Sequence, residues 1–291
     1  MTTSGSATFD KRLTLARPDL AAASLRGRVE AARYVEPQCD CVIAEVADVR
    51  QFPSPSAPLE TQALRGEIVH VCEIDEGWAW GQLESDGYVG YLPAALLAPA
   101  GPAPTHRVQV LRTFLYPGPS MKLPVERALP LNARVCVSDI TGAFARLGDE
   151  GFVWADHLAP LDRVEPDFVA VAERFVGVPY LWGGKSPLGL DCSGLVQTSL
   201  AAAGMAAPRD TDMQEQALGA PLPVNDDLGG LQRGDLVFWK GHVGIMRDAH
   251  VLLHANGHHM LVASEALRGA VERIRSSSFG AITSIRRLAD R

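Results

Sequence analysis

The sequence lacks any long run of apolar residues. A helix that crosses a bilayer needs about 18 of them, and no stretch of the 291 residues approaches that length. A secretory signal needs an uninterrupted apolar stretch of about 7 to 15 residues, but charged residues break up the segment 1–26. We therefore expect a protein that has no membrane partner and stays in the cytoplasm.

Positive charge is also scarce. Lys and Arg number 27 against 34 Asp and Glu, which gives a formal net charge of -7, and the basic residues form no stripe. Nucleic-acid binders usually carry a concentrated basic surface that neutralises phosphates. The sequence therefore argues against a nucleic-acid partner.

Cysteine is rare and odd in number. The chain has five cysteines, and four of them lie in scattered strand-like stretches, so we expect reduced core thiols with one thiol left over for chemistry. Cys39 and Cys41 are a weak metal signal, because a strand points alternate side chains to opposite faces. We expect neither a metal nor an organic cofactor.

What is present is an ordinary globular composition, with 47% apolar and 21% charged residues. A chain of this length exceeds one typical domain. We expect an extended or partly helical N-terminal arm at 1–37. From 38 to 99, short β-like runs alternate with Gly and Asp turns and predict a small β-barrel, with strands at 42–44, 67–71, 77–81 and 87–92.

The same order recurs in weaker form after a Pro-, Ala- and Gly-rich linker at 100–107. The segment GYVGY at 87–91 and the segment GFVW at 151–154 hold equivalent places. We therefore predict a second barrel over 100–163. Both barrels resemble bacterial SH3-like modules, in which a glycine-aromatic-valine-aromatic segment forms a late strand.

The composition changes again from residue 164. Apolar residues at helical spacing predict a helix over 167–175, and a second helix follows at 191–203. Three strands are then expected at 235–239, 243–246 and 251–255. Helices followed by an antiparallel sheet make an α+β domain over 164–291.

Cys192 lies where a sequence would place a nucleophile. A Gly-rich loop precedes it, Asp191 has N-cap chemistry, and Leu195 begins the apolar stripe of the following helix. A thiolate at a helix N-terminus is stabilised by unpaired N–H groups and the helix dipole. The same N–H groups can form an oxyanion hole.

A cysteine nucleophile needs a base, and the base needs a third group to orient it. His242 is flanked by glycines and leads into a predicted strand, and His254 ends the next one. An antiparallel hairpin would bring these two histidines side by side. The alternatives are a buried inert thiol at Cys192, a core histidine at position 254, and a zinc site made of these three residues, although short zinc-motif spacings are absent.

Several spaced motifs closely resemble the NlpC-type, papain-like cell-wall cysteine peptidases over about 170 to 265. They are YLWGG at 180–184, DCSGL at 191–195, PRDT at 208–211 with Gln214, RGDLVFW at 233–239, and GHVGI at 241–245 followed by His254 and Ala255. The resemblance implies a triad of Cys192, His242 and His254.

Two SH3-like barrels before such a domain resemble cytoplasmic enzymes that cut murein peptides during recycling. This resemblance implies hydrolysis of the γ-D-glutamyl–diamino acid bond in peptides with a free N-terminal L-Ala, because the first barrel caps the substrate groove. It also implies that Tyr88, Asp191 and Ser193 hold the substrate amine. A buried carboxylate at position 191 would need a cation, and an α-ammonium would supply one.

Other roles for these residues stay open. Asp191 has the alternative role of a helix cap alone, Tyr88 that of a barrel-core aromatic, and Tyr91 competes with Tyr88. A glutamate of the first barrel contributes in some relatives, and Glu60 and Glu67 are both candidates. The functional rivals are an amidase or acyltransferase of the same fold, and a peptide-binding protein with a vestigial triad. The sequence does not determine the oligomeric state.

Overall fold

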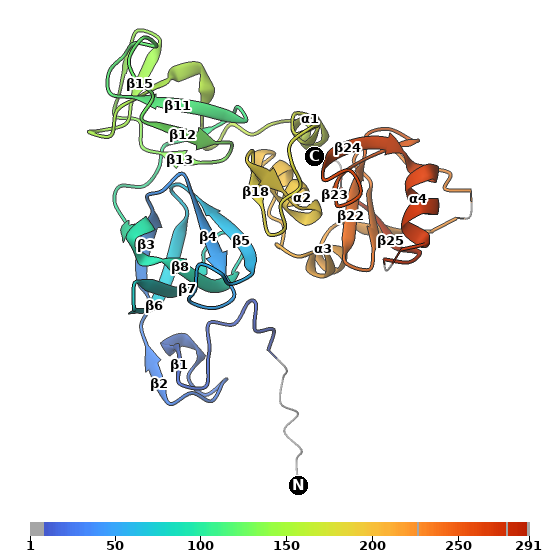
Figure 1. Ribbon diagram of the computed structural model, residues 1–291, viewed down its shortest axis with the longest axis horizontal. Helices are drawn as coiled ribbons and strands as arrows, with labels where there is room; N and C mark the ends of the chain where they lie inside the picture. The colour runs from blue at the N-terminus through green and yellow to red at the C-terminus, as the bar shows by residue number, and fades with distance from the viewer. Residues whose placement is uncertain (1–8, 226, 278, 290–291) are drawn as a thin grey trace. The chain divides into compact units, whose positions relative to one another are not determined.

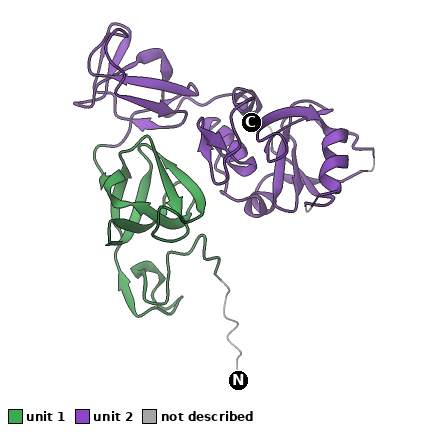
Figure 2. Ribbon diagram, viewed as in Figure 1, with its two compact units in different colours: residues 1–102 green, residues 103–291 purple. Residues whose placement is uncertain are grey.

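The structure is a computed structural model that describes residues 9–225, 227–277 and 279–289. The chain divides into two compact units between Pro102 and Ala103 (Figures 1 and 2). Within the described ranges, no helix is long and apolar enough to cross a membrane.

From residue 9 onward, where the structure describes it, the N-terminal arm is extended and has a single 3-10 turn. Its elements are β1 (Leu20–Ala22), the 3-10 helix η1 (Ala23–Leu25) and β2 (Arg33–Val35), and the two strands pair in parallel. Leu15 and Leu20 pack against Trp80 of the following module. The guanidinium of Arg17 lies 4.3 Å from the centroid of the Trp80 ring and donates a hydrogen bond to the hydroxyl of Tyr91 at 3.0 Å. These contacts attach the arm to the module that follows it. Residues 1–8 of the predicted arm lie outside the described residues.

The first module is a seven-stranded antiparallel sheet in the order β5-β4-β8-β7-β6-β3-β9. Alternate residues point inward, as Ala47 and Val49 do along β4, and build a small apolar core. Its elements are β3 (Gln38–Val42), β4 (Val46–Arg50), β5 (Leu59–Leu64), β6 (Ile68–Asp75), β7 (Trp78–Leu83), β8 (Val89–Pro93), the 3-10 helix η2 (Ala94–Leu96) and β9 (Leu97–Pro99).

The strand predictions in this module differ from the structure at three strands. The strand expected at 42–44 is β3, which begins at Gln38 and ends at Val42. Strands β4 and β5 escaped prediction, because β5 carries the buried polar residues Thr61 and Gln62 where an apolar pattern was sought. The Gln62 amide is satisfied by a hydrogen bond to Asp48 of β4 at 3.1 Å.

A second small all-β module follows and has a core of its own. It contains a three-stranded and a five-stranded antiparallel sheet, ordered β13-β10-β17 and β12-β11-β16-β15-β14. Its elements are β10 (His106–Val108), β11 (Arg112–Tyr116), β12 (Arg127–Pro130), β13 (Arg134–Val135), β14 (Asp139–Thr141), β15 (Phe144–Arg146), β16 (Phe152–Trp154), the 3-10 helix η3 (Ala155–His157) and β17 (Leu158–Pro160).

The two modules end in the same way. In each, a late strand runs into a one-turn 3-10 helix and then into a three-residue strand that reads Leu-Ala-Pro, at 97–99 in the first module and at 158–160 in the second. The backbone dihedrals at the start of the two 3-10 helices are nearly identical, with φ -59° and ψ 121° at Pro93 and φ -58° and ψ 120° at Trp154. The repeated pattern found in the sequence is therefore also a repeat in three dimensions.

Residues 164–289 build a domain of helices on an antiparallel sheet in the order β20-β25-β21-β22-β23-β24. Its elements are α1 (Phe168–Glu173), β18 (Lys185–Ser186), β19 (Gly189–Leu190), α2 (Cys192–Ala202), α3 (Thr211–Ala217), β20 (Ala220–Leu222), β21 (Leu236–Trp239), β22 (His242–Met246), β23 (Val251–Asn256), β24 (Leu261–Ala266), α4 (Leu267–Arg275) and β25 (Ile282–Arg287).

Both faces of this sheet are covered, and alternation along the strands assigns each residue to one face. Phe238, Ile245 and Leu253 pack with α1 and α2, whereas Trp239 and Leu252 pack with α4. Figure 1 shows α2 and α4 on opposite sides of the sheet. Helix α2 is buried nearly all round instead of along one stripe, because the second β module covers part of it.

The second module caps the C-terminal end of α2. The Arg107 guanidinium donates to the carbonyl of Ala202 at 3.1 Å, and the Asn132 amide donates to the carbonyl of Thr198 at 2.9 Å. Leu131 belongs to the same apolar core as α2. A cation at a helix C-terminus satisfies its last carbonyls and opposes its dipole. The module is therefore part of the structure that holds α2.

The cysteines differ from the expectation of buried thiols. Cys39 and Cys136 are exposed, Cys41 and Cys72 are half-buried, and only Cys192 is buried. Cys39, Cys41 and Cys72 lie on strands whose inward positions are taken by other residues, such as Val69 and Val71 beside Cys72, and Cys136 follows the end of β13. All five thiols are free.

Candidate active site

The site is built around the first turn of α2. Asp191 is the N-cap, and its carboxylate accepts a hydrogen bond from the Gly194 N–H at 2.7 Å. Cys192 is the first helical residue and is 7% exposed. Its sulfur accepts hydrogen bonds from the backbone N–H groups of Ser193 and Val243. The thiol therefore lies against the start of β22, next to His242.

Gly194 is required by close packing. A Cβ built on it would lie 2.1 Å from the carbonyl oxygen of Gly184 and 2.9 Å from the Asp191 carboxylate. The Gly-rich loop thus crosses directly over the first turn of α2, and only glycine leaves room for it. The loop and the Ser-Gly pair after the cysteine, two separate features of the sequence, are two sides of one contact.

His242 and His254 come together as the hairpin argument predicted. They lie on the neighbouring antiparallel strands β22 and β23, and Nε2 of His242 is 2.8 Å from Nδ1 of His254. His242 is 6% exposed and His254 is fully buried. Because Nε2 of His242 is engaged with His254, Nδ1 is the nitrogen left for the thiol.

A carboxylate that sequence reasoning missed lies behind this pair. Oε1 of Glu265 on β24 is 2.7 Å from Nε2 of His254. Arg273 on α4 donates a hydrogen bond to the same oxygen. The signal that could have found Glu265 is its position on the strand after His254, on the sheet face that Leu252 and His254 share.

The resting charge state differs from the expected thiolate. Burial, and to a smaller extent the Asp191 carboxylate, raises the pKa of Cys192 to about 11, against the smaller effect of the hydrogen bonds to the sulfur. Burial lowers the pKa of His242 to about 3. The ring faces Trp239 and Phe279, each with ring centroids 5.6 Å from that of His242. Desolvation outweighs the helix N-terminus here, so the resting pair is a neutral thiol and a neutral imidazole.

The partner of Asp191 also corrects the sequence argument. Arg209, 1% exposed, donates to both oxygens of the Asp191 carboxylate at 2.6 and 3.0 Å. It also donates to the Ser193 hydroxyl at 2.8 Å, and that hydroxyl donates to Asp191 at 3.3 Å. The argument that the buried carboxylate needs an external ammonium is wrong, because the chain supplies the cation.

Two further side chains, those of Thr211 and Tyr180, interact with Cys192. The hydroxyl oxygen of Thr211, the first residue of α3, is 3.7 Å from the sulfur. The phenol of Tyr180 lies where burial, with the nearby Cys192 and Asp191, raises its pKa, so it stays a hydrogen-bond donor. Both belong to motifs in the sequence, but a motif does not reveal which member faces the sulfur.

Tyr88 lies in the first unit, in a hollow of about 410 Å³ that the arm and the first module line together. It is 2% exposed and belongs to the module core, yet its hydroxyl donates to the Glu60 carboxylate at 3.2 Å. Tyr91 also lines the hollow but its hydroxyl accepts from Arg17. Of the two candidate glutamates, the structure places Glu60 with Tyr88, while Glu67 lies in the turn before β6.

No group of three or more His, Cys, Asp or Glu side chains that could hold a metal ion occurs among the described residues. His242 and His254 are instead directed at each other and at Glu265. The site offers a nucleophile, a base and an orienting pair, which is the equipment for acyl transfer.

A cysteine at the start of a central helix, with its sulfur against the sheet strand that carries a histidine, defines a cysteine peptidase of papain-like architecture. Comparison with known sequences gives the family. Residues 49–97 match the bacterial dipeptidyl-peptidase Sh3 domain, and residues 177–276 match the NlpC/P60 family.

Two relatives extend these matches over most of the chain. The γ-D-glutamyl-L-lysine dipeptidyl-peptidase of Bacillus subtilis is 31% identical over 223 residues, which are 70% of this chain and 71% of the relative. The enzyme of the same name from Bacillus cereus is 29% identical over 234 residues, 72% of this chain and 68% of the relative. The chain belongs to the NlpC/P60 family. In fold it is similar to an NlpC/P60 family protein from Bacillus cereus, with a TM-score of 0.70 and 20% identity over 86% of this chain and 99% of that one.

Proposed function

We propose that this enzyme hydrolyses the bond between γ-D-glutamate and a diamino acid in murein peptides that carry a free N-terminal L-Ala. The observation that carries the chemistry is the placement of Cys192 against β22 beside His242, with His254 behind it. The specificity is supported by the two Bacillus relatives, which are named for the γ-D-glutamyl-L-lysine bond.

The proposed mechanism is acyl transfer through the thiol. Nδ1 of His242 takes the proton from Cys192 as the sulfur attacks the γ-glutamyl carbonyl, and the S–C bond forms while the carbonyl electron pair moves to oxygen. In this mechanism, N–H groups at the start of α2 and the Tyr180 phenol donate hydrogen bonds to that oxygen. The imidazolium then protonates the leaving amine, and water releases the acyl product.

The requirement for a free amine is supported by Glu60. Among the described residues, no Lys, Arg or His pairs with this carboxylate, and the Tyr88 hydroxyl hydrogen-bonds to it. A carboxylate next to a phenol in a hollow is a good site for an ammonium group. Asp191 and Ser193 enter the proposal as supports of the nucleophile, since Arg209 already neutralises Asp191.

Three finer points belong to the same proposal. The second all-β module is an SH3-like domain, as its matching strand, 3-10 helix and Leu-Ala-Pro ending support. The enzyme acts in the cytoplasm, where exposed free thiols such as Cys39 and Cys136 are maintained. Its peptides come from cell-wall turnover, so the enzyme serves recycling.

Mass spectrometry of cleavage products tests the proposal. Wild type should release L-Ala-D-Glu from L-Ala-γ-D-Glu-diaminopimelate and from the L-Lys peptide, but not from the N-acetylated forms. Glu60→Gln should lose most of this discrimination, and the matched control Glu84→Gln, an exposed change in the same module, should keep it. Equal cleavage of free and acetylated peptides would overturn the amine requirement. Cleavage of neither peptide would overturn the proposed peptidase activity and favour an amidase or acyltransferase reaction at this site.

A further inference from the structure

The two active-site histidines are the first members of a longer chain of polar contacts. Nε2 of His242 is 2.8 Å from Nδ1 of His254, and Nε2 of His254 is 2.7 Å from Oε1 of Glu265. These polar contacts run across the three adjacent strands β22, β23 and β24. Arg273 of α4 anchors its far end at Glu265. His254 is fully buried, so solvent does not compete for its ring nitrogens.

The direction of each hydrogen bond follows from the carboxylate. Hydrogen bonding to His254, together with the charge of Arg273, lowers the pKa of Glu265 against the opposing effect of burial. An ionised carboxylate only accepts hydrogen bonds. Nε2 of His254 must therefore carry the proton that it shares with Glu265.

The proton position on His254 in turn determines the proton position on His242. Burial lowers the pKa of both histidines, so each ring is neutral and has one N–H. With its proton on Nε2, His254 presents a bare Nδ1, which can only accept. His242 must then donate from Nε2, and its own Nδ1 is left with the lone pair that deprotonates a thiol.

We propose that Glu265 is a positioning residue that fixes the tautomer of both histidines and so makes Nδ1 of His242 the base. This inference rests on the proposed function of Cys192 and His242 and adds a fourth member to their constellation. Arg273 keeps the Glu265 carboxylate ionised and in place. The groups that face this carboxylate are His254 from β23, Arg273 from α4, and His259, whose Nδ1 is 4.0 Å from Oε1.

The charge that develops during attack follows the same path. The S–H bond of Cys192 breaks and an N–H bond forms at Nδ1 of His242, which becomes an imidazolium. Its positive charge is stabilised through His254 by the carboxylate of Glu265, without the carboxylate becoming protonated. In Glu265→Gln the amide can turn its NH₂ toward His254, which reverses both hydrogen bonds and leaves Nδ1 of His242 protonated.

Nitrogen-15 NMR of histidine-labelled protein reads the tautomers without any substrate. In wild type at pH 7 we expect both His242 and His254 to carry the proton on Nε2, and a protonated Nδ1 on either ring would overturn the proposal even if no variant folds. In Glu265→Gln we expect a Nδ1–H population on His242. Glu272→Gln, an exposed change on α4, is the matched control and should leave both tautomers unchanged.

Alkylation of Cys192 by iodoacetamide, followed at the peptide level, gives a second readout that is independent of the peptide substrate. The Glu265→Gln rate should fall about 100-fold near neutral pH, the scale of a lost general base, and Glu265→Asp should recover part of it. A Glu265→Gln rate equal to that of wild type would sink the role of Glu265. If the alkylation and tautomer results hold but no murein peptide is cleaved, the substrate proposal fails and the role of Glu265 stands.

Discussion

Arg209 lies behind the nucleophile with its guanidinium in a two-pronged ion pair with Asp191, the residue that caps the nucleophile helix. Arg209 is 1% exposed and Asp191 is 7% exposed. Two charges removed from water are tolerated only when they are paired and hydrogen-bonded. The backbone N–H groups of Gly183 and Gly194 donate to Asp191 at 2.9 and 2.7 Å, and the Ser193 hydroxyl donates at 3.3 Å. The pair thus joins the Gly-rich loop, the start of α2 and the segment after it.

Removal of the Arg209 cation should lower the free energy of unfolding. Arg209→Leu leaves a buried carboxylate without its partner, and we expect a loss of about 3 to 5 kcal/mol in the free energy of unfolding. Urea unfolding followed by fluorescence measures it, with Arg112→Leu, an exposed change on β11, as the control. Asp191→Asn in the Arg209→Leu background should recover part of the loss. Equal stability of the two Arg variants would contradict a structural role for the pair.

Cys192 and His242 could be proposed from the sequence as nucleophile and base because each lies in a recognisable local pattern. A cysteine after a helix cap and a histidine between glycines at a strand start are visible in short segments around residues 192 and 242. Arg209 and Glu265 were missed because their roles depend on which distant segments pack together. Neither residue lies in a pattern that tells a buried ion pair from a solvated charge.

The lowered pKa of His242 predicts that the enzyme stays active at acidic pH. A histidine whose pKa is lowered to about 3 by burial remains a neutral base far below the usual value of about 6.5. The acid limb of the kcat/KM profile should therefore lie below pH 5 in wild type. Phe279→Ala uncovers one face of the ring, so the pKa should rise and the limb should move to higher pH.

The readout is the ratio of kcat/KM at pH 5 to that at pH 8, which cancels any change in substrate contact. It should fall several-fold in Phe279→Ala and stay at the wild-type value in Phe114→Ala, an exposed phenylalanine on β11. An unchanged ratio in both variants would show that Phe279 does not set the protonation of the base.

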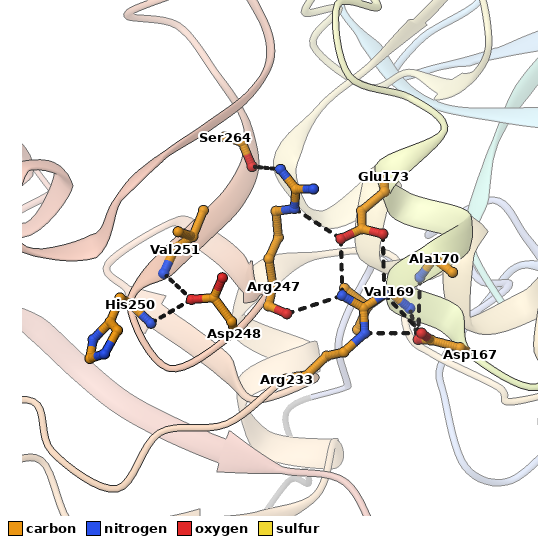
Figure 3. A network of polar contacts seen from close by, with 10 residues as sticks. All are labelled: Asp167, Val169, Ala170, Glu173, Arg233, Arg247, Asp248, His250, Val251 and Ser264. Carbon is orange, nitrogen blue, oxygen red and sulfur yellow. Dashed lines mark hydrogen bonds and ion pairs between the residues drawn. The ribbon is translucent and has the colours of Figure 1, made fainter.

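A cluster of ion pairs fastens α1 to the sheet (Figure 3). Glu173 at the end of α1 accepts hydrogen bonds from Arg233 and Arg247, both at 2.9 Å, and Arg233 also pairs with the helix cap Asp167 at 2.8 Å. Arg247 continues to Ser264 on β24 at 2.9 Å. Figure 3 shows the two guanidinium groups converging on Glu173.

This cluster predicts a pH-dependent part of the stability. Hydrogen bonding from Arg233, joined by Arg247 and opposed by burial, lowers the pKa of Glu173. A lowered pKa in the folded state gives stability that is complete above the unfolded value of about 4.3 and is lost as pH falls through the folded value. Glu173→Gln should therefore cost about 1 kcal/mol at pH 7 and much less at pH 3.

Thermal unfolding from pH 3 to pH 7 measures this difference. Glu126→Gln, an exposed change in the second module, is the control and should follow wild type at every pH. A Glu173→Gln deficit that is constant across this range would assign the effect to packing and not to charge.

The fold could also be predicted only in part, namely where a short segment of sequence determines its own secondary structure. The helices at 168–173 and 192–202 each follow an aspartate cap, and the strand pair with His242 and His254 consists mostly of apolar residues. Strand β24 and helix α4 were missed, although Leu267, Ala270, Val271 and Ile274 give α4 an apolar face at helical spacing. The contact of the second module with α2 could not be predicted from the sequence either, because it depends on two side chains, Arg107 and Asn132, that donate hydrogen bonds to helix carbonyls.

The central claim is that Cys192 forms an acyl-enzyme with the murein peptide, and rapid-quench mass spectrometry tests it most directly. Wild type mixed with L-Ala-γ-D-Glu-L-Lys and quenched in acid should gain the mass of one L-Ala-D-Glu acyl group on the peptide that contains Cys192. Cys192→Ala should show neither adduct nor hydrolysis, and Cys136→Ala, which removes an exposed thiol, should behave as wild type. An adduct on another residue, or hydrolysis by Cys192→Ala at the wild-type rate, would contradict the account.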